Sequence, residues 1–264
     1  MSDRRLYAPD YVDAGTGPLV VLLHASLAGA RQWSALTESL EQRYSLRAIN
    51  LFGYGRTPAW PAREAPTLDD YAELALAAIP ADTPEVTLIG HSFGGAVAMQ
   101  AARRLGARAT KLVLLEPSIF ALLEMCGRSD AYAEIAAVAR DTALNPPEAA
   151  AERFIDFWSG PGAWAATPEP RRAAYRRGIG LVRNEFAAAF GARLTLDDWR
   201  DTLPRRTLVT FAADTTRPSR EIAALLSLAG AGWAFARMQS GGHMAPVTRP
   251  DLVNPVIAQF LDQA

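Results

Sequence analysis

The sequence predicts an α/β protein built on a mostly parallel, doubly wound β-sheet. Short runs rich in valine, leucine and isoleucine alternate with longer helix-like segments. The runs are almost uninterrupted in apolar residues, as expected of strands that are buried on both faces. The chain has 264 residues and half of them are hydrophobic, which suffices for one large folded core.

Strand-like and helix-like segments alternate through the first 117 residues. Edge strands are expected within residues 5–13. The later strand-like runs are residues 18–24, 44–51, 85–92 and 111–117, and the helix-like segments between them are 31–43, 68–79 and 93–105. Thr67 is a suitable N-cap for the second helix, and Gly106 is expected to end the third. This alternation favours parallel strand pairing with helices on both faces.

A long segment without a strand pattern interrupts this rhythm. Residues 118–203 are rich in alanine, contain ten aromatic side chains and are divided by prolines into several helix-like pieces. We expect a helical domain inserted after the sixth strand, lying over the C-terminal edge of the sheet. Residues 1–117 and 204–264 then form the core domain, which two further strands at 206–214 and 233–238 and a last helix at 250–261 complete.

The residues Gly90-His91-Ser92-Phe93-Gly94 match the pattern G-x-S-x-G. A buried strand precedes the pattern and a helix follows it, as a serine exposed at a sharp strand-to-helix turn requires. Such a serine has strained backbone dihedrals, and small neighbours let the strand and the helix pack closely. We interpret Ser92 as a nucleophile; a glycine-rich turn with an incidental serine is the competing interpretation.

In this context the chain resembles the α/β-hydrolase family, along almost its whole length outside the insertion. His24-Ala25 resembles the family's His-Gly pair after its third strand, with alanine replacing the usual glycine. The resemblance implies an oxyanion hole made by the backbone N–H groups of Ser26 and Phe93, with Leu27 as a second candidate for the first donor. It also implies that residues 118–203 are a cap domain that covers the pocket.

His243 is the predicted general base. The chain has three histidines, His24, His91 and His243, and the family order is serine, then acid, then histidine. Only His243 follows Ser92, in a glycine-rich loop between the last strand and the last helix. An imidazole there is suited to accept the serine proton at neutral pH. His24 and His91 are expected to have structural roles.

Two carboxylates compete for the acid that orients His243. Asp214 ends the strand-like run at 206–214, as the family's acid follows its penultimate strand, so the predicted acid is Asp214. An ordinary helix N-cap is its competing role. Glu116, near the end of residues 111–117, is the rival, because some relatives place their acid after that earlier strand.

The aromatic side chains of the insertion suggest a small-molecule substrate with an apolar acyl or alkyl group. Leu27, Tyr54, Phe120 and Trp158 are the predicted substrate contacts. Arginines in the insertion offer a second possibility, a substrate carboxylate, although their helical spacing is more typical of a solvated face; they are Arg171, Arg172, Arg176, Arg177 and Arg183.

Composition argues against several other classes of protein. The formal net charge is −1, which gives no basic face for nucleic acid. The single cysteine excludes a disulfide framework, and no apolar run approaches the roughly 18 residues of a membrane span. We see no signal peptide, no metal-ligand spacing and no phosphate or dinucleotide loop. A cytoplasmic protein without a cofactor, metal, membrane or nucleic-acid partner is expected.

Three functions remain open at this point. The first is a serine esterase acting through an acyl-enzyme. The second is a carbon–carbon bond hydrolase of ring-fission products, which residues 24–29 resemble in spacing and which would use the arginines of the insertion. The third is a receptor-like member of the fold with little turnover. Thioester hydrolysis, lactone opening and perhydrolysis use the same catalytic groups, and fold alone does not separate them.

Overall fold

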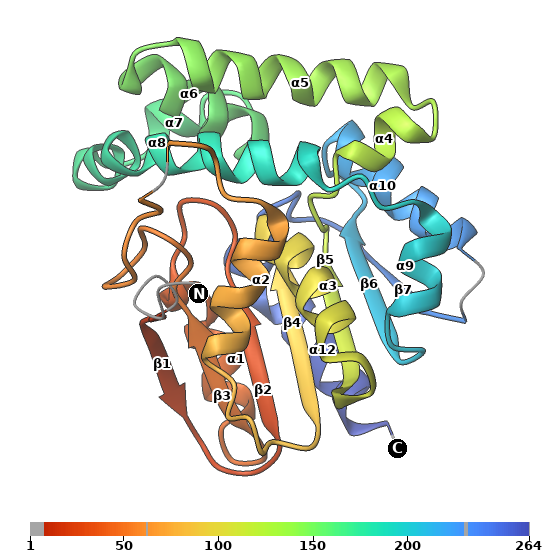
Figure 1. The fold of residues 1–264 in the computed structure, drawn as a ribbon. Coiled ribbons are helices and arrows are strands. Elements are labelled where there is room, and N and C mark those ends of the chain that lie inside the picture. Colours follow the sequence, from red (N-terminus) through yellow and green to blue (C-terminus); the bar gives the residue numbers. More distant parts are fainter. Residues whose placement is uncertain (1–7, 62, 230–231, 264) are drawn as a thin grey trace.

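The computed structural model describes residues 8–61, 63–229 and 232–263 (Figure 1). Its strands form one sheet in the order β1-β3-β2-β4-β5-β6-β7, and only β1 runs antiparallel to its neighbour. The strands are β1 (Tyr11–Ala14), β2 (Leu19–Leu23), β3 (Ser45–Ile49), β4 (Val86–His91), β5 (Ala109–Leu115), β6 (Thr207–Ala212) and β7 (Ala234–Met238). The predicted fold class is therefore confirmed.

The edge of the sheet differs from the prediction in one respect. Edge strands were expected within residues 5–13, and the structure has one, β1, which begins at Tyr11; residues 1–7 lie outside the described part of the chain. The helical insertion therefore follows the fifth described strand, β5, and not the sixth.

Helices cover both faces of the sheet because alternate residues of each buried strand face opposite sides. Leu23 and Val209 pack in one cluster, while Leu22 and Leu208 pack in another. The first cluster includes residues of α2 (Leu68–Ala77), α3 (Phe93–Leu105), α9 (Leu196–Thr202) and α10 (Arg217–Leu228), and the second includes α1 (Ser34–Leu40), α11 (Ala245–Thr248), α12 (Pro250–Asp262) and the 3-10 helix η1 (Ala30–Trp33). The uninterrupted apolar runs of the sequence follow from this double burial.

Two helix boundaries follow local signals in the sequence. The Thr67 hydroxyl accepts a hydrogen bond from the Asp70 N–H at the start of α2, and the Asp70 carboxylate accepts one from the Thr67 N–H. Such a reciprocal pair satisfies two N–H groups that the helix leaves free. Gly106 follows the end of α3 with φ of 56°, a conformation that glycine adopts without strain, and begins the 3-10 helix η2 (Gly106–Arg108).

The insertion between β5 and β6 is helical throughout, and α5–α8 lie above the upper edge of the sheet (Figure 1). Its helices are α4 (Ala121–Met125), α5 (Ser129–Leu144), α6 (Pro147–Ser159), α7 (Ala163–Ala166), α8 (Glu169–Gly191) and α9. The last of these, α9, packs against α3 beside the sheet instead of above it. The division into a core domain and a cap domain stays a prediction, and we use the word cap below for helices α4–α8.

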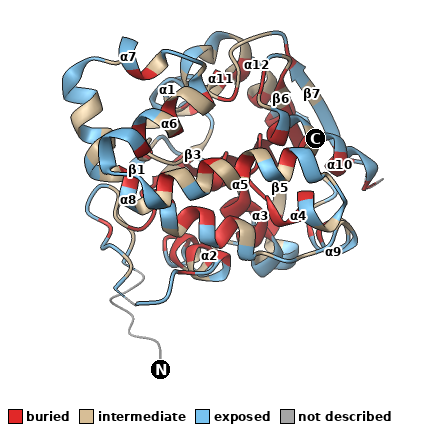
Figure 2. Ribbon diagram, turned by 90° about the horizontal axis from the view of Figure 1, so that it is seen from above, coloured by how far each residue is buried: buried red, intermediate tan, exposed pale blue. Residues whose placement is uncertain are grey.

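The cap shares its apolar core with one face of the sheet. Phe154 and Trp158 of α6 and Phe186 of α8 belong to the same cluster as Leu23 of β2. Seen from above, buried residues gather in the centre of the molecule, whereas β7 is largely exposed at its rim (Figure 2). None of the described helices combines the length and the apolar character that crossing a bilayer requires.

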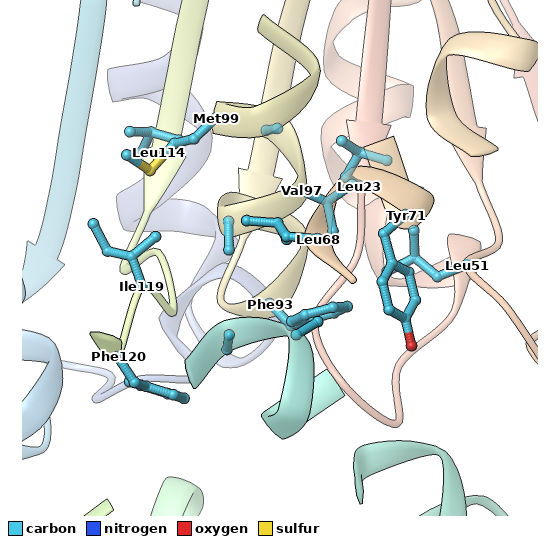
Figure 3. Packing of buried hydrophobic residues seen from close by; sticks show 14 of the residues in the cluster. Leu23, Leu51, Leu68, Tyr71, Phe93, Val97, Met99, Leu114, Ile119 and Phe120 are labelled. Atoms are coloured by element: carbon cyan, nitrogen blue, oxygen red, sulfur yellow. The ribbon is translucent and has the colours of Figure 1, made fainter. Parts of the chain in front are cut away.

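A packed layer of aromatic rings supports the start of α3. The ring centroids of Tyr71 and Phe93 are 4.7 Å apart in an edge-to-face contact, and Leu23, Leu51 and Leu68 surround them (Figure 3). Because α3 begins at Phe93, this packing fixes the position of the turn between β4 and α3. The functional site lies at that turn.

Candidate active site

Ser92 lies at the turn between β4 and α3, with φ of 56° and ψ of −121°. Close packing explains the glycines around it. A Cβ added to Gly90 would lie 2.2 Å from the Gly94 carbonyl oxygen, and one added to Gly94 would lie 2.3 Å from the Leu23 carbonyl oxygen. No larger residue fits without a backbone shift at either position. The predicted strand–turn–helix geometry is present.

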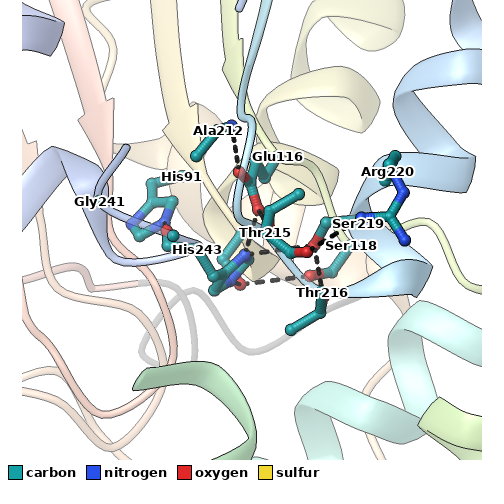
Figure 4. A network of polar contacts seen from close by, with 12 residues as sticks. His91, Glu116, Ser118, Ala212, Thr215, Thr216, Ser219, Arg220, Gly241 and His243 are labelled. Carbon is teal, nitrogen blue, oxygen red and sulfur yellow. Dashed lines mark hydrogen bonds and ion pairs between the residues drawn. The ribbon is translucent and has the colours of Figure 1, made fainter. Parts of the chain in front are cut away.

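Ser92, His243 and Glu116 form a continuous hydrogen-bonded row, and Figure 4 shows His243 beside Glu116. The Ser92 Oγ lies 2.8 Å from His243 Nε2, and His243 Nδ1 lies 2.7 Å from Glu116 Oε2. With the Nδ1–H donated to the carboxylate, Nε2 is free to accept the serine proton. All three residues are buried, with exposures of 5%, 3% and 5%.

Glu116 is held by several donors where β5 ends. Its Oε1 accepts a hydrogen bond from the Ala212 N–H at 2.8 Å, and its Oε2 accepts one from the Thr215 hydroxyl. Burial alone would raise the pKa of this carboxyl, but the hydrogen bond and charge of His243, with the donors of Thr215 and Ala212, hold the pKa below its usual value. Glu116 is therefore present as a carboxylate beside the imidazole.

Asp214 is not the acid beside His243, which corrects the sequence-based assignment. Its carboxylate accepts hydrogen bonds from the Gly241 N–H at 3.2 Å and the Gly242 N–H at 2.9 Å. Among the described residues it makes no hydrogen bond to the imidazole. Asp214 follows β6 by two residues and is exposed, so its side chain reaches the loop that carries His243 and not the ring. The rival, Glu116, occupies the expected position of the acid.

The other two histidines have structural hydrogen bonds, as expected. His24 Nε2 accepts the Leu51 N–H at 3.1 Å, so its Nδ1–H donates to the Ala25 carbonyl at 2.7 Å. His91 Nε2–H donates to the backbone carbonyl of His243 at 2.8 Å. Burial lowers the pKa of His24 to about 4 and that of His91 to about 3, so both rings are neutral at physiological pH.

The loop after β2 lies beside Ser92. Ser26 lines both cavities at Ser92, and its N–H donates to no other described residue. The Leu27 N–H is different, because it donates to the Tyr54 hydroxyl at 2.9 Å. Phe93 is the first residue of α3, so its N–H has no intrahelical partner. Ser26 and Phe93 thus keep free N–H groups, whereas Leu27 does not.

Backbone strain is concentrated at this site. Outside glycine, positive φ angles occur at three described residues, which are Leu27 at 60°, Ser92 at 56° and Glu116 at 48°. Each such residue costs of the order of 1–3 kcal/mol, so the surrounding packing must stabilise it. The three lie in the loop after β2, at the nucleophile turn and at the carboxylate.

Two cavities meet at Ser92. The outer one has a volume of about 330 Å³ and is lined by Ser92, His243, Leu27, Trp158 and Arg171, among others. The inner one has about 10 Å³ and lies between Ser92, Phe120 and cap residues that include Trp158 and Phe186. Tyr54 lines neither cavity, because its hydroxyl is directed to Leu27 and Glu185. Of the four predicted contacts, Leu27, Phe120 and Trp158 therefore face the space at Ser92.

The cap contacts the imidazole directly. The rings of Trp158 and His243 have centroids 4.0 Å apart and an interplanar angle of 34°. The Ser118 hydroxyl lies 3.2 Å from Ser92 Oγ. Trp158 shields the ring from water, and Ser118 offers a second partner for the serine hydroxyl.

Four polar residues of the site carried no functional prediction, and one of them is Ser219, whose hydroxyl lies 3.3 Å from His243 Nδ1. Thr215 and Ser118 stand directly after predicted strands, where polar residues are common. Glu185 is only 2% exposed, and its signal in the sequence is an acid among the apolar positions of one face of α8, next to Val182 and Phe186. The described residues contain no cluster of three or more side chains suited to bind a metal ion.

A family model and a curated relative both match most of this chain. The model of a family described as "Alpha/beta hydrolase family" matches residues 20–256. A pimeloyl-[acyl-carrier protein] methyl ester esterase of Aromatoleum aromaticum is 29% identical over 258 residues, which is 89% of this chain and 94% of the relative.

Solved structures give the same fold. An esterase from Exiguobacterium antarcticum has a TM-score of 0.75 at 20% identity, covering 97% of this chain and 96% of its own. A meta-cleavage product hydrolase from Pseudomonas fluorescens has a TM-score of 0.73 at 18% identity, covering 96% and 94%. At these identities the two structures support the architecture alone.

Proposed function

The chain belongs to the alpha/beta hydrolase family, and from this premise we propose that it hydrolyses a carboxylic ester through Ser92, His243 and Glu116. The observation that carries the proposal is the buried row of hydrogen bonds, 2.8 Å from Ser92 to His243 and 2.7 Å from His243 to Glu116. A nucleophile, a base within reach of its proton and a carboxylate that orients the base are the parts that acyl transfer needs.

In the proposed reaction Ser92 Oγ attacks the ester carbonyl carbon while His243 Nε2 takes the hydroxyl proton. The tetrahedral intermediate then collapses, the proton moves from Nε2 to the departing alkoxide, and the alcohol leaves an acyl group on Ser92. A water molecule then attacks in the same way. Nε2 takes a proton from the water, and the water oxygen attacks the acyl carbon. The proton returns to Ser92 Oγ as the carboxylic acid departs.

Glu116 acts through His243. Its carboxylate accepts the Nδ1–H, keeps the ring in the required tautomer and stabilises the imidazolium that forms in each transition state. The lowered pKa of Glu116 supports this role, because the carboxyl stays ionised when the ring gains its proton. Asp214 contributes by holding the backbone of the glycine loop before His243.

The oxyanion is assigned to the N–H groups of Ser26 and Phe93. Phe93 stands at the N-terminus of α3, where free N–H groups and the helix dipole favour negative charge. Each such donor is worth a factor of about 100–1,000 in kcat. The engagement of the Leu27 N–H with Tyr54 supports Ser26 over Leu27 as the first donor.

The two cavities suggest an ester with one small and one larger group. The inner pocket, at about 10 Å³, has the volume that one water-sized group occupies. The outer cavity, at about 330 Å³, accepts a longer chain along Leu27 and Ile155. A methyl ester, the substrate class in the name of the Aromatoleum aromaticum relative, has this shape.

Active-site labelling tests the chemistry. A fluorophosphonate probe is expected to label the wild-type protein at Ser92 and to leave the Ser92→Ala variant unlabelled, since the probe needs an activated serine. Failure of the wild-type protein to react would contradict the proposal and favour the receptor-like function. A panel of methyl and p-nitrophenyl esters of increasing acyl length then tests the cavity sizes. If an ester with bulky groups on both sides of the carbonyl were cleaved as fast as one with a single bulky group, the assignment of a small and a large pocket would be contradicted.

A second candidate is hydrolysis of a carbon–carbon bond in an acidic ring-fission dienoate. The observation that favours it is the charge of the outer cavity, whose lining includes Arg31 and Arg171 but no aspartate or glutamate. Such a lining suits a substrate carboxylate. Measuring kcat/KM for a p-nitrophenyl ester and for a ring-fission dienoate separates the two functions, because the ester hydrolase is expected to favour the ester by a large factor.

A further inference from the structure

A buried carboxyl of the cap has no part in the proposed reaction. Glu185 lies on α8 and is 2% exposed, yet its side chain lines the inner pocket together with Ser26 and Ser92. Burial of a carboxyl without a cation is costly, and no ion pair involves Glu185 among the described residues. The position therefore calls for a polar partner of its own.

Two hydroxyls supply this need, and the Ser26 hydroxyl is one of them. The Tyr54 hydroxyl donates to Glu185 Oε1 at 2.8 Å and accepts the Leu27 N–H at 2.9 Å. A phenol has one hydrogen to donate and lone pairs to accept with, so the two hydrogen bonds are compatible and each polarises the other. Glu185 must accept this hydrogen bond. Both the ionised carboxylate and the carbonyl oxygen of the protonated acid can do so. A polar row thus connects the cap to the loop after β2.

Leu27 is the strained member of that loop. Its φ is 60°, in the left-handed region that a leucine rarely adopts, and it directly follows Ser26. Because the Leu27 N–H is fixed by Tyr54, the peptide plane between Ser26 and Leu27 is fixed as well. The orientation of the Ser26 N–H depends on the same short loop.

Apolar contacts of α8 reinforce this row. Gly178, Leu181 and Glu185 share one face of the helix, since they are separated by three and four residues. A Cβ on Gly178 would lie 3.0 Å from Leu27 Cδ2, and a Cβ on Gly53 would lie 2.5 Å from Leu181 Cδ2. Helix α8 therefore packs against both the loop that contains Leu27 and the turn that contains Tyr54.

We propose that Glu185 is a positioning residue that, through Tyr54, holds the Leu27 loop in the shape that directs the Ser26 N–H at the reacting carbonyl. The cap then completes the oxyanion hole in addition to covering it. This inference rests on the proposed function, since it assigns Ser26 to that hole. Catalysis by the core is in this way made dependent on the docking of α8.

Three variants test the row. Tyr54→Phe removes one oxygen, and Glu185→Leu removes the acceptor. Each is expected to lower kcat for a p-nitrophenyl ester by about tenfold or more while KM changes by less than about threefold, because an oxyanion donor acts in the transition state. Glu185→Gln keeps an acceptor and is expected to retain kcat within about threefold of the wild type.

The double variant and a matched control make the test specific. Combining Tyr54→Phe with Glu185→Leu is expected to cost no more than about twofold beyond Glu185→Leu alone, because that change has already broken the row. Tyr71→Phe removes another buried phenol hydroxyl near Glu185 that makes no hydrogen bond to the loop, and kcat within about twofold of wild type is expected. Additive losses, or an equal loss in Tyr71→Phe, would overturn the inference.

Amide hydrogen exchange gives a readout that does not need turnover. In peptides covering residues 26–28, protection of the Leu27 amide is expected to fall in Tyr54→Phe and Glu185→Leu and to remain in Glu185→Gln. Unchanged protection in Tyr54→Phe would overturn the inference even if no substrate were hydrolysed. If instead the wild-type protein cleaves no ester but the variants show the expected changes in exchange, the proposed function is wrong. The link from Glu185 through Tyr54 to Leu27 is then still supported.

Discussion

Glu116 and Asp214 follow neighbouring strands of the same sheet, but only Glu116 reaches the ring of His243. Glu116 comes directly after β5, turns inward with φ of 48° and is 5% exposed. Asp214 comes two residues after β6 and stays exposed, bound to the N–H groups of Gly241 and Gly242. Position after a parallel strand brings a side chain to the correct edge of the sheet, and the turn that follows decides what it touches.

The two acids hold the same histidine in different ways. Glu116 binds the imidazole itself, whereas Asp214 binds the backbone of the loop that carries it. His91 adds a third contact, because its Nε2–H donates to the His243 carbonyl. The role of Glu116 requires a negative charge, since the imidazole becomes a cation during the reaction. The role of Asp214 requires only a hydrogen-bond acceptor in the correct position.

Glu116→Gln is the largest expected effect and tests this comparison most directly. The glutamine has nearly the same size but no charge, and its amide N–H₂ competes for the place of the oxygen beside Nδ1. We expect kcat for a p-nitrophenyl ester to fall by about 1,000-fold or more at pH 8, as loss of the acid does in related triads. Retention of more than a tenth of wild-type kcat would show that the acid lies elsewhere.

A third carboxyl, Glu185, sharpens the comparison because it is as buried as Glu116 but has the opposite pKa shift. Burial raises the pKa of Glu185 to about 7 against the opposing effect of the Ser26 and Tyr54 hydroxyls. Those hydroxyls and the phenol of Tyr71 on α2 face it, and both tyrosines have pKa values raised above their usual range, so they remain neutral.

The sign of the pH dependence follows from that raised pKa. A carboxyl that binds its proton more tightly when folded stabilises the protein below its unfolded pKa, and this contribution is lost as the pH rises through about 7. Relative to Glu185→Gln, the free energy of unfolding of the wild type is expected to fall by about 2 kcal/mol between pH 5 and pH 8. Urea denaturation of both proteins at each pH measures it, and parallel profiles would contradict the assignment.

Asp214→Asn is the smallest expected effect and the control for Glu116→Gln. The asparagine keeps one oxygen that can accept from the Gly242 N–H, so the loop retains most of its support. We expect kcat to fall by less than about tenfold, corresponding to no more than the roughly 1.4 kcal/mol that a loosened loop costs. A loss as large as that of Glu116→Gln would instead mean that Asp214 acts in the reaction.

The nucleophile was predictable because its geometry is local. The glycines at 90 and 94, the buried strand before them and the helix after them lie within about twenty consecutive residues. The close contact between Gly90 and the Gly94 carbonyl lies within that stretch and leaves little choice of conformation, whereas the contact of Gly94 with the Leu23 carbonyl comes from the neighbouring strand. The base was predictable by position, since His243 is the one histidine after Ser92 in the chain.

The contacts of Tyr54 and Glu185 could not be predicted in the same way. Tyr54 stands in a turn that suggested a substrate contact, and the structure directs its hydroxyl into the protein between Leu27 and Glu185. Glu185 is 131 residues away from Tyr54 in sequence. Only the docking of α8 on the core brings the two together, and that docking depends on the packing of the whole cap.

The sequence by itself determined the sheet, the helical insertion, and the identity of the serine and histidine, because strand burial, helix capping and the nucleophile turn each depend on neighbouring residues. The tertiary structure decided which carboxylate meets His243 and how the cap meets the loop after β2. Those contacts join residues more than a hundred positions apart. Their geometry is set by strand order and by positive φ angles at Leu27 and Glu116, for which short stretches of sequence carry no signal.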